Sequence, residues 1–419
     1  MDSFDKLGDE IESLWREANY NEEPFPALAA AALKRHDLPS KLSAWDAVEW
    51  SLAQAELPRQ RDLRAGFGEP PVTMYSGPRF HIDIYFWFEG TTAVHQHGFC
   101  GAFQVLLGSS IHSWFEWTRR VGVNTFCEIG DINLKICELL EKGDVQEIWA
   151  GKKYIHSLFH LDQPSATIVV RTDRSPLELP QFAYHRPFLA VDPFFEQETT
   201  TKKLQLVAAL IRALHPDADR LIAEWLSSSD LQTSFSILSQ LRGLLRSNQL
   251  SQLFKLDEPK TRFENFLGIV AKRHGANGEI FRAVFERYDM LDEIVQRRGF
   301  VTDPEHRFFM ALLLNVDKRD HIFALIKQRY PDADPAEQLL DWVFDLAQTR
   351  VVGVENSNAL GIPDFGEPEM FALENLLQGK DDDEIKQAFA TESPRADETT
   401  ITDAIAKIRG SVIFRPLLA

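Results

Sequence analysis

Cysteine is scarce in this 419-residue chain, which has only Cys100, Cys127 and Cys137. A small, odd number without regular spacing argues against a disulfide framework and favours a reducing compartment. The sequence also lacks any apolar run near the roughly 20 residues that a membrane-spanning helix needs. Its first residues are acidic and show no signal-peptide profile. These absences predict a cytoplasmic protein with no membrane partner.

Basic residues are outnumbered, because 45 Lys and Arg face 63 Asp and Glu, for a net charge of −18. Such a chain repels phosphate backbones, so no nucleic-acid partner is expected. A local basic pocket can still exist in an acidic chain, so small anionic molecules remain compatible with it. The sequence also has no P-loop, dinucleotide fingerprint, GxSxG elbow or CxxC pair. The commonest sequence evidence for nucleotide binding, serine hydrolysis and thiol redox chemistry is therefore missing.

The spacing of apolar residues changes along the chain. Residues 1–68 show helical spacing, and 69–196 hold about eight short strand-like segments between Gly- and Pro-rich turns. From 197 to 419 apolar residues recur with a period near 3.6, which predicts amphipathic helices. We therefore predict an α+β protein with an N-terminal helical cap, a central β-barrel or jelly roll and a large C-terminal all-α region. The proline-rich connector 175–194 is expected to cross the barrel surface, and the polar stretch 380–400 to be mobile.

The clearest strand pattern lies at 80–88, where apolar and mainly polar or aromatic side chains alternate. Side chains of a strand alternate between its two faces, so this segment has one face for each kind. The alternation places Phe80, Ile82, Ile84, Phe86 and Phe88 on one face, and His81, Asp83, Tyr85 and Trp87 on the other.

Histidines mark the candidate site. His95 and His97 are two residues apart in a strand-like segment, so their side chains are expected on the same face. His156 lies in a later strand, after the turn signal Gly143-Asp144. If that strand packs opposite, the three imidazoles form a facial set suited to a divalent first-row metal. His81 and His112 are interpreted as structural.

The two histidine-bearing segments resemble the two motifs of the cupin superfamily, over about residues 75–190. The matching positions are Gly90-x4-His95-x-His97-x3-Gly101-x6-Gly108 and Gly143-Asp144 followed by His156-x3-His160. The resemblance implies a cupin double-stranded β-helix barrel with a metal held inside by His95, His97 and His156. Gly101 stands where the family has its acidic ligand. Three histidines without an acid resemble the cysteine dioxygenase-like branch, which uses Fe(II).

That resemblance implies a non-haem iron dioxygenase that acts on a small thiol or carboxylate substrate with O2. Neutral nitrogen ligands also accept Ni, Mn or Zn. Three alternatives stay open: a cupin that has lost its metal, a non-catalytic sensor or scaffold that binds a protein partner through its helical region, and a metal cupin isomerase or lyase. The C-terminal helices are equally compatible with a scaffold, a lid or a homodimer surface.

Four further residues are candidates for catalytic roles. Tyr85 shares its strand face with Trp87 and either lines a cavity or belongs to the barrel core. Tyr154 precedes His156 by two residues, so its hydroxyl is placed to orient a bound ligand. Arg171 ends an apolar strand and is a candidate to bind a substrate carboxylate, or else a solvated strand end.

Cys100 is the fourth of these candidates, and His160 is considered beside it. In the cysteine dioxygenase-like branch a cysteine at the acid position can bond to a tyrosine, and Cys100 lies one residue from that position. The alternative is a small buried residue. His160 has the same strand parity as His156, so it is either a hydrogen-bond partner or an alternative ligand.

Overall fold

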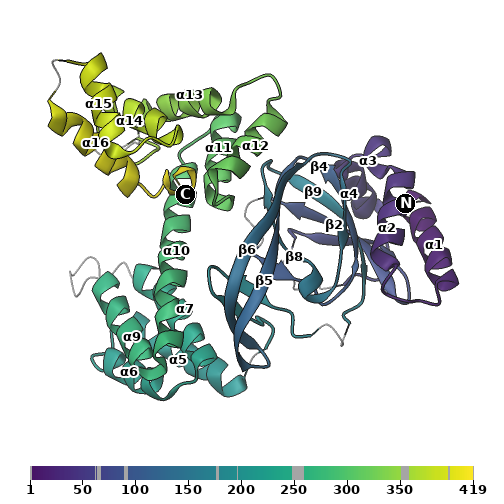
Figure 1. Ribbon diagram of the computed structural model, residues 1–419. Coiled ribbons are helices and arrows are strands. Elements are labelled where there is room, and N and C mark those ends of the chain that lie inside the picture. Colours follow the sequence, from purple (N-terminus) through teal and green to yellow (C-terminus); the bar gives the residue numbers. More distant parts are fainter. Residues whose placement is uncertain are drawn as a thin grey trace.

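The computed structural model describes residues 2–61, 63, 68–88, 93–175, 179–195, 197–247, 259–350, 358–394 and 397–418. Gly90, which opens the first histidine motif, lies outside these residues. In the described part a β-sheet region lies between N-terminal helices on one side and C-terminal helices on the other (Figure 1).

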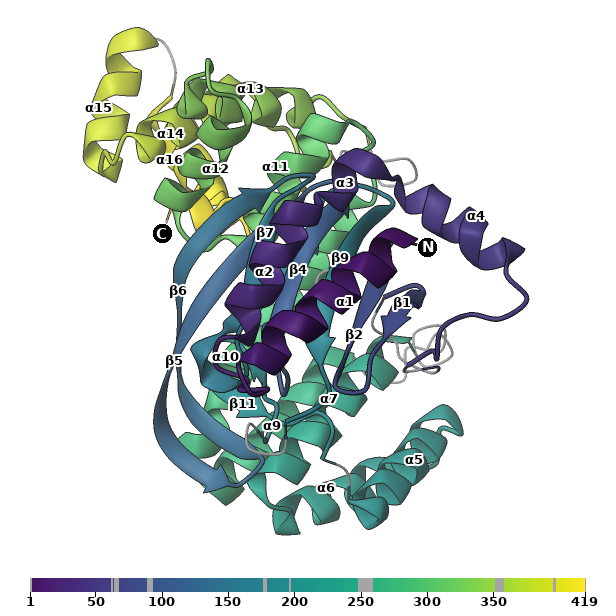
Figure 2. The ribbon, with the colours of Figure 1, turned by 90° about the vertical axis from the view of Figure 1, so that its right-hand side faces the viewer.

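The N-terminal helices cover one face of a sheet, as Figure 2 shows for α1 and α2. Their bounds are α1 Asp2–Glu17, α2 Phe25–His36, α3 Leu38–Lys41 and α4 Ala44–Ala53. Ser43 and Asp46 form a capping box at the start of α4. Phe4 of α1 and Phe25 of α2 belong to one buried cluster with Phe80 of the sheet. The expected helical cap is present.

The covered sheet has five antiparallel strands in the order β1-β2-β9-β4-β7. Their bounds are β1 Pro71–Ser76, β2 Phe80–Trp87, β4 Gly101–Leu107, β7 Val145–Ile148 and β9 Ser165–Thr172. Phe80, Ile82, Ile84 and Phe86 of β2 pack beneath the helices, whereas Tyr85 and Trp87 pack in a different cluster with Tyr154 and Leu158. The alternation expected over β2 is therefore confirmed.

The remaining strands form a closed barrel in the order β10-β11-β6-β5-β8-β3. Their bounds are β3 His95–Gln96, β5 Ser110–Asn124, β6 Cys127–Leu140, β8 Ile155–His160, β10 Ala183–His185 and β11 Leu189–Val191. The connector does not simply cross the surface, because β10 pairs with β3 and β11 pairs with β6. A mixed fold with a closed barrel is confirmed, and its finer description as a double-stranded β-helix stays a prediction.

The C-terminal helices form two groups joined by the long helix α10 (Figure 1). Their bounds are α5 Glu198–Arg212, α6 Ala218–Ser228, α7 Leu231–Ser247, α9 Pro259–His274, α10 Ala276–Arg298, α11 Pro304–Asn315, α12 Arg319–Arg329, α13 Pro335–Ala347, α14 Glu367–Leu377, α15 Asp382–Glu392 and α16 Glu398–Gly410. The first group shares a buried cluster with Ile129 and Leu189 of the barrel, and the second with Ile111 and Phe159. Within the stretch 380–400, which was expected to be mobile, Asp382–Glu392 form α15 with a capping box at Asp381, whereas 395–396 lie outside the described residues.

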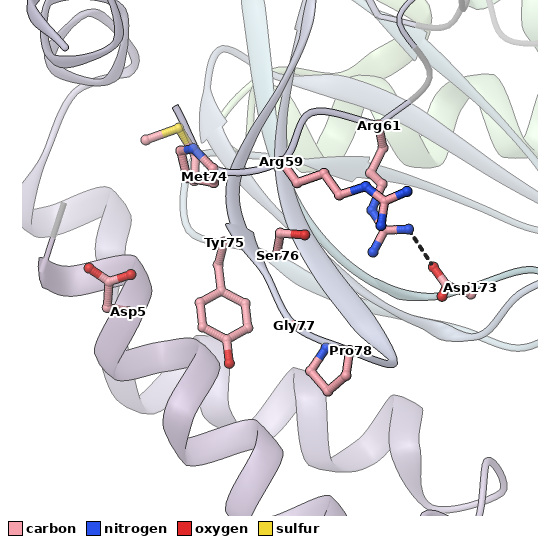
Figure 3. A pocket seen from close by; sticks show the side chains of 10 residues that line it. Asp5, Arg59, Arg61, Met74, Tyr75, Ser76, Gly77, Pro78 and Asp173 are labelled. Carbon is pink, nitrogen blue, oxygen red and sulfur yellow. Dashed lines mark hydrogen bonds and ion pairs between the residues drawn. The ribbon is translucent and has the colours of Figure 1, made fainter. Parts of the chain in front are cut away.

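None of the helices in the described ranges is both long enough and apolar enough to cross a lipid bilayer. A polar pocket of about 550 Å³ lies beside α1 and β1 (Figure 3). Arg59, Arg61 and Asp173 line it, and Arg61 Nη1 is 3.4 Å from Asp173 Oδ1. Asp173 Oδ1 is also 3.8 Å from Nδ1 of the buried His81. Asp173 therefore contacts both Arg61 of this pocket and the buried His81 of β2.

Candidate metal centre

Strand pairing brings His95 and His156 together. His95 of β3 is paired directly with His156 of β8. Side chains of directly paired residues project from the same face with Cβ atoms about 4.5–5.5 Å apart. The two ring centroids are accordingly 4.8 Å apart. The sequence led us to expect His156 on a strand packed opposite; it comes instead from the neighbouring strand of the same barrel.

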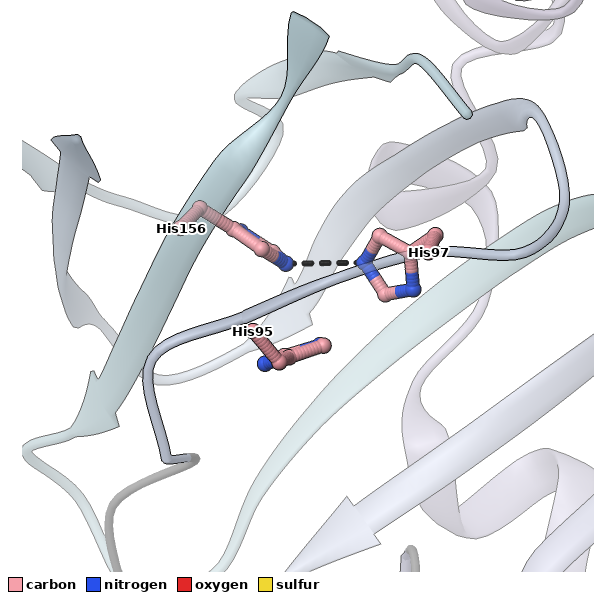
Figure 4. Close-up of side chains that lie close together, drawn as sticks. All are labelled: His95, His97 and His156. Atoms are coloured by element: carbon pink, nitrogen blue, oxygen red, sulfur yellow. Dashed lines mark hydrogen bonds between the residues drawn. The ribbon is translucent and has the colours of Figure 1, made fainter. Parts of the chain in front are cut away.

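His97 completes the group from just beyond β3. Its backbone forms an isolated bridge with Ala150, and its carbonyl accepts a hydrogen bond of 2.8 Å from Gly151 N. His97 Nε2 lies 2.8 Å from His156 Nε2. One nitrogen from each of His95, His97 and His156 lies within 4.8 Å of the others, and Figure 4 shows the three rings gathered together.

All three imidazoles are neutral at pH 7. Burial lowers the pKa of His95, and burial together with neighbouring positive charge lowers the pKa of His97 and His156 well below the ordinary value. His95 Nδ1 lies 2.7 Å from the carbonyl oxygen of Ala93, which requires a proton on Nδ1. The lone pair of His95 is therefore on Nε2, so this residue is prepared as a metal ligand.

The residues present fit a divalent metal ion. A single N–H···N hydrogen bond joins only His97 and His156. A cation between the rings uses all three lone pairs at once. Among the described residues, the group that can hold an ion consists of His95, His97 and His156 and includes no carboxylate. Neutral nitrogen donors of this kind suit first-row metals rather than Mg²⁺ or Ca²⁺.

A second layer of polar side chains stands behind His156. His112 Nε2 of β5 lies 3.3 Å from His156 Nδ1 and 3.1 Å from the Tyr154 hydroxyl. His112 Nδ1 lies 2.9 Å from Glu138 Oε1 of β6, and Gln146 Nε2 donates to the same oxygen at 2.9 Å. Tyr154 thus lies beside His156, as its position two residues earlier suggested. Burial, together with the charge of Glu138, raises the pKa of the Tyr154 hydroxyl well above the ordinary value.

Sequence reasoning interpreted His112 as structural and missed Glu138. The two residues are a cross-strand pair of the β5–β6 ribbon. The register of that ribbon shifts at irregularities, between Trp114 and Phe115 and again further along. Counting residues from the turn therefore does not find the pair, and no local signal in the sequence marks Glu138.

Arg171 and Tyr85 lie together on the inner face of the five-stranded sheet. The Arg171 guanidinium lies 3.7 Å from the centroid of the Phe99 ring, and the Phe99 ring centroid is 4.4 Å from that of His97. Arg171 Nη1 donates to the Tyr85 hydroxyl at 3.4 Å, and that hydroxyl donates to Asp83 Oδ2 at 3.3 Å. Arg171 is thus one aromatic ring away from His97, and Tyr85 contacts Arg171.

Asp83 anchors this inner-face group. Burial alone would raise its pKa, but the hydrogen bond and charge of His81 and the charge of Arg171 reverse that effect and lower it. Asp83 therefore stays ionised and provides a fixed negative charge beneath Tyr85.

The structure does not bring Cys100 or His160 to the three histidines. Cys100 packs in the cluster beneath the N-terminal helices, with its Sγ 3.7 Å from the carbonyl oxygen of Glu22. His160 stacks on Trp87 with ring centroids 4.6 Å apart, and its Nδ1 lies 3.0 Å from Ser110 Oγ. Burial lowers the pKa of His160 to about 3, so it is a neutral member of the barrel interior.

Comparisons with known proteins add little to this geometry. No family model and no curated protein matches the chain. Similar solved structures include a cupin-2 domain containing protein from Shewanella frigidimarina NCIMB 400, at 13% identity over 31% of this chain and 94% of that one, with a TM-score of 0.19. Another is the DMSP lyase DddQ from Ruegeria pomeroyi DSS-3, at 14% identity over 44% of this chain and 96% of that one, with a TM-score of 0.23. At these values neither likeness says what this chain binds or does.

Proposed function

We propose that this protein is a metal-dependent cupin and a non-haem Fe(II) oxygenase that acts on a small thiol or carboxylate with O2. The observation that carries the proposal is the convergence of His95, His97 and His156 without a carboxylate. Three neutral ligands leave the full charge of a divalent ion in place, which favours an anionic substrate as a further ligand. Fe(II) bound there would supply Lewis acidity and the capacity to activate O2.

Gly101 supports the all-histidine ligand set. A Cβ atom at this position of β4 would lie 1.9 Å from the carbonyl oxygen of Val170 in β9. Because the clash is with backbone, no side chain fits there without moving a strand. The position where the cupin motif has its acid is therefore closed to any ligand.

Protein side chains near the histidines suit an anionic substrate. Arg171 presents a guanidinium, the group that binds carboxylates in bidentate fashion, and Tyr85 provides a hydroxyl at its edge. Phe99 lies between Arg171 and His97 and offers an apolar wall. We infer that Arg171 and Tyr85 hold the substrate carboxylate while the reacting end lies toward the three histidines.

The test begins with untagged protein purified without chelators, because a histidine tag would bind metal itself. We expect about one Fe per chain after loading under argon, and O2 consumption with at least one member of a panel of small thiols and carboxylates. A His97→Ala variant should lose both. Wild-type protein that retains no Fe, Ni, Mn or Zn above the level of the variant would refute the proposal. Metal binding without turnover would favour a sensor.

A second candidate is a metal-dependent isomerase or lyase. The observation that favours it is the hydrogen-bonded series Tyr154–His112–Glu138, which can move protons at a buried site without any need for O2. Turnover of the same panel under argon separates the two proposals, since only the isomerase or lyase would continue at an undiminished rate.

A further inference from the structure

We propose that His112 and Glu138 are positioning residues that set the tautomer and orientation of His156. Because Gly101 leaves no room for an acidic ligand, Glu138 also provides the carboxylate of the site, behind His156 rather than in contact with the metal. The inference rests on the proposed metal site. It assigns a role to two residues that contact no ion themselves.

The hydrogen-bonding capacities of the groups determine the direction of the series. An ionised Glu138 can only accept, so the 2.9 Å contact requires a proton on His112 Nδ1. His112 Nε2 then carries one lone pair, which two donors share: a proton on His156 Nδ1 at 3.3 Å and the Tyr154 hydroxyl at 3.1 Å. With its proton on Nδ1, His156 directs the lone pair of Nε2 toward His97.

Burial and backbone pairing restrict the His112 and Glu138 side chains to one geometry. His112 is only 1% exposed, so its ring cannot turn to water for other partners. Glu138 sits in the barrel wall with a side chain 35% exposed, and Gln146 holds the same carboxylate oxygen that His112 contacts. Because His112 and Glu138 are paired across β5 and β6, the backbone ladder itself sets their distance.

The chemical consequence concerns the ligand strength of His156. A carboxylate that accepts a hydrogen bond from an imidazole makes that imidazole a stronger electron donor. Glu138 acts on His156 in this way through the intervening ring of His112. Gly101 cannot carry an acid in direct contact with the ion, because of the backbone of β9. Glu138 would therefore balance part of the charge of a bound ion from a distance, without taking the place of a ligand.

The experiment compares Co²⁺ binding by full-length wild type, Glu138→Ala, Glu138→Gln and the control Asp131→Ala. Asp131 is also on β6, is similarly exposed at 43%, and pairs with Arg120 rather than with the histidines. We expect Glu138→Ala to weaken Co²⁺ binding by about 10- to 100-fold and to shift the visible absorption bands of the bound ion. Glu138→Gln, whose amide oxygen can still accept from His112, should lose less. Asp131→Ala should match wild type in both measurements.

The outcomes are distinguishable. If wild type binds Co²⁺ and Glu138→Ala binds it with the same affinity and spectrum as Asp131→Ala, the positioning role is refuted while the metal site stands. If wild type binds no metal, the proposed function and this inference both fall. Should Glu138→Ala not fold, the isosteric Glu138→Gln decides: a weaker affinity and shifted bands support the role, and unchanged values refute it.

Discussion

Replacing Gly101 by alanine tests the close approach of β4 and β9 that shapes the site. The added Cβ would lie 1.9 Å from the oxygen of Val170, 2.9 Å from its carbonyl carbon and 3.0 Å from the Cα of Arg171. Non-bonded heavy atoms prefer about 3.5–4.0 Å, so the two strands must separate by at least about 1 Å. Overpacking costs roughly 1–3 kcal/mol, and each weakened backbone hydrogen bond about 1 kcal/mol more. We expect the free energy of unfolding to fall by about 3 kcal/mol.

The assay is urea unfolding followed by tryptophan fluorescence and circular dichroism. Gly268→Ala is the control, because a Cβ at Gly268 in α9 meets no atom within 4 Å. Alanine is the better helix former by up to about 1 kcal/mol, so the control should be neutral or stabilising. A Gly101→Ala variant as stable as wild type would refute the exclusion of side chains. So would a Gly101→Glu variant that folds normally and binds metal more tightly.

Three further predictions concern metal, acid and thiols. Zn²⁺ at 100 times its dissociation constant should stabilise wild type by about 2.7 kcal/mol, and an equal rise in melting temperature for His97→Ala would contradict the site. Burial lowers the pKa of His185, which is hydrogen-bonded to Tyr288, to about 4 in the folded chain. The unfolded chain, with a histidine pKa near 6.5, then binds more protons, so stability present at pH 7 should fall by about 3 kcal/mol as the pH drops from about 6.5 to about 4. Urea midpoints of wild type and His185→Gln across that range check this, and parallel curves would argue against it. Burial also raises the pKa of Cys127 to about 12 and of Cys137 to about 11, so native protein at pH 7.5 should react with iodoacetamide far more slowly than urea-unfolded protein; similar rates by mass spectrometry would show that these thiols are accessible.

The features that the sequence predicted correctly are the ones that depend on local periodicity. The alternation of 80–87 predicted which side chains of β2 lie beneath the N-terminal helices, because strand side chains change faces at every residue. The 3.6 period from 197 onward predicted the C-terminal helices for the same kind of reason. Local turn and motif signals likewise singled out His95, His97 and His156, which the structure groups together.

By itself, then, the sequence determined the classes of its segments, the faces of its strands and the identity of three candidate ligands. Only the tertiary structure decided that His156 pairs beside His95, that β10 and β11 help to close the barrel, and that Glu138 reaches the site through His112. It also decided that the backbone of β9 closes Gly101 to any side chain. The physical reason is that these contacts depend on which strands pair and on a register set by pairing and bulges, and no local pattern of residues encodes either.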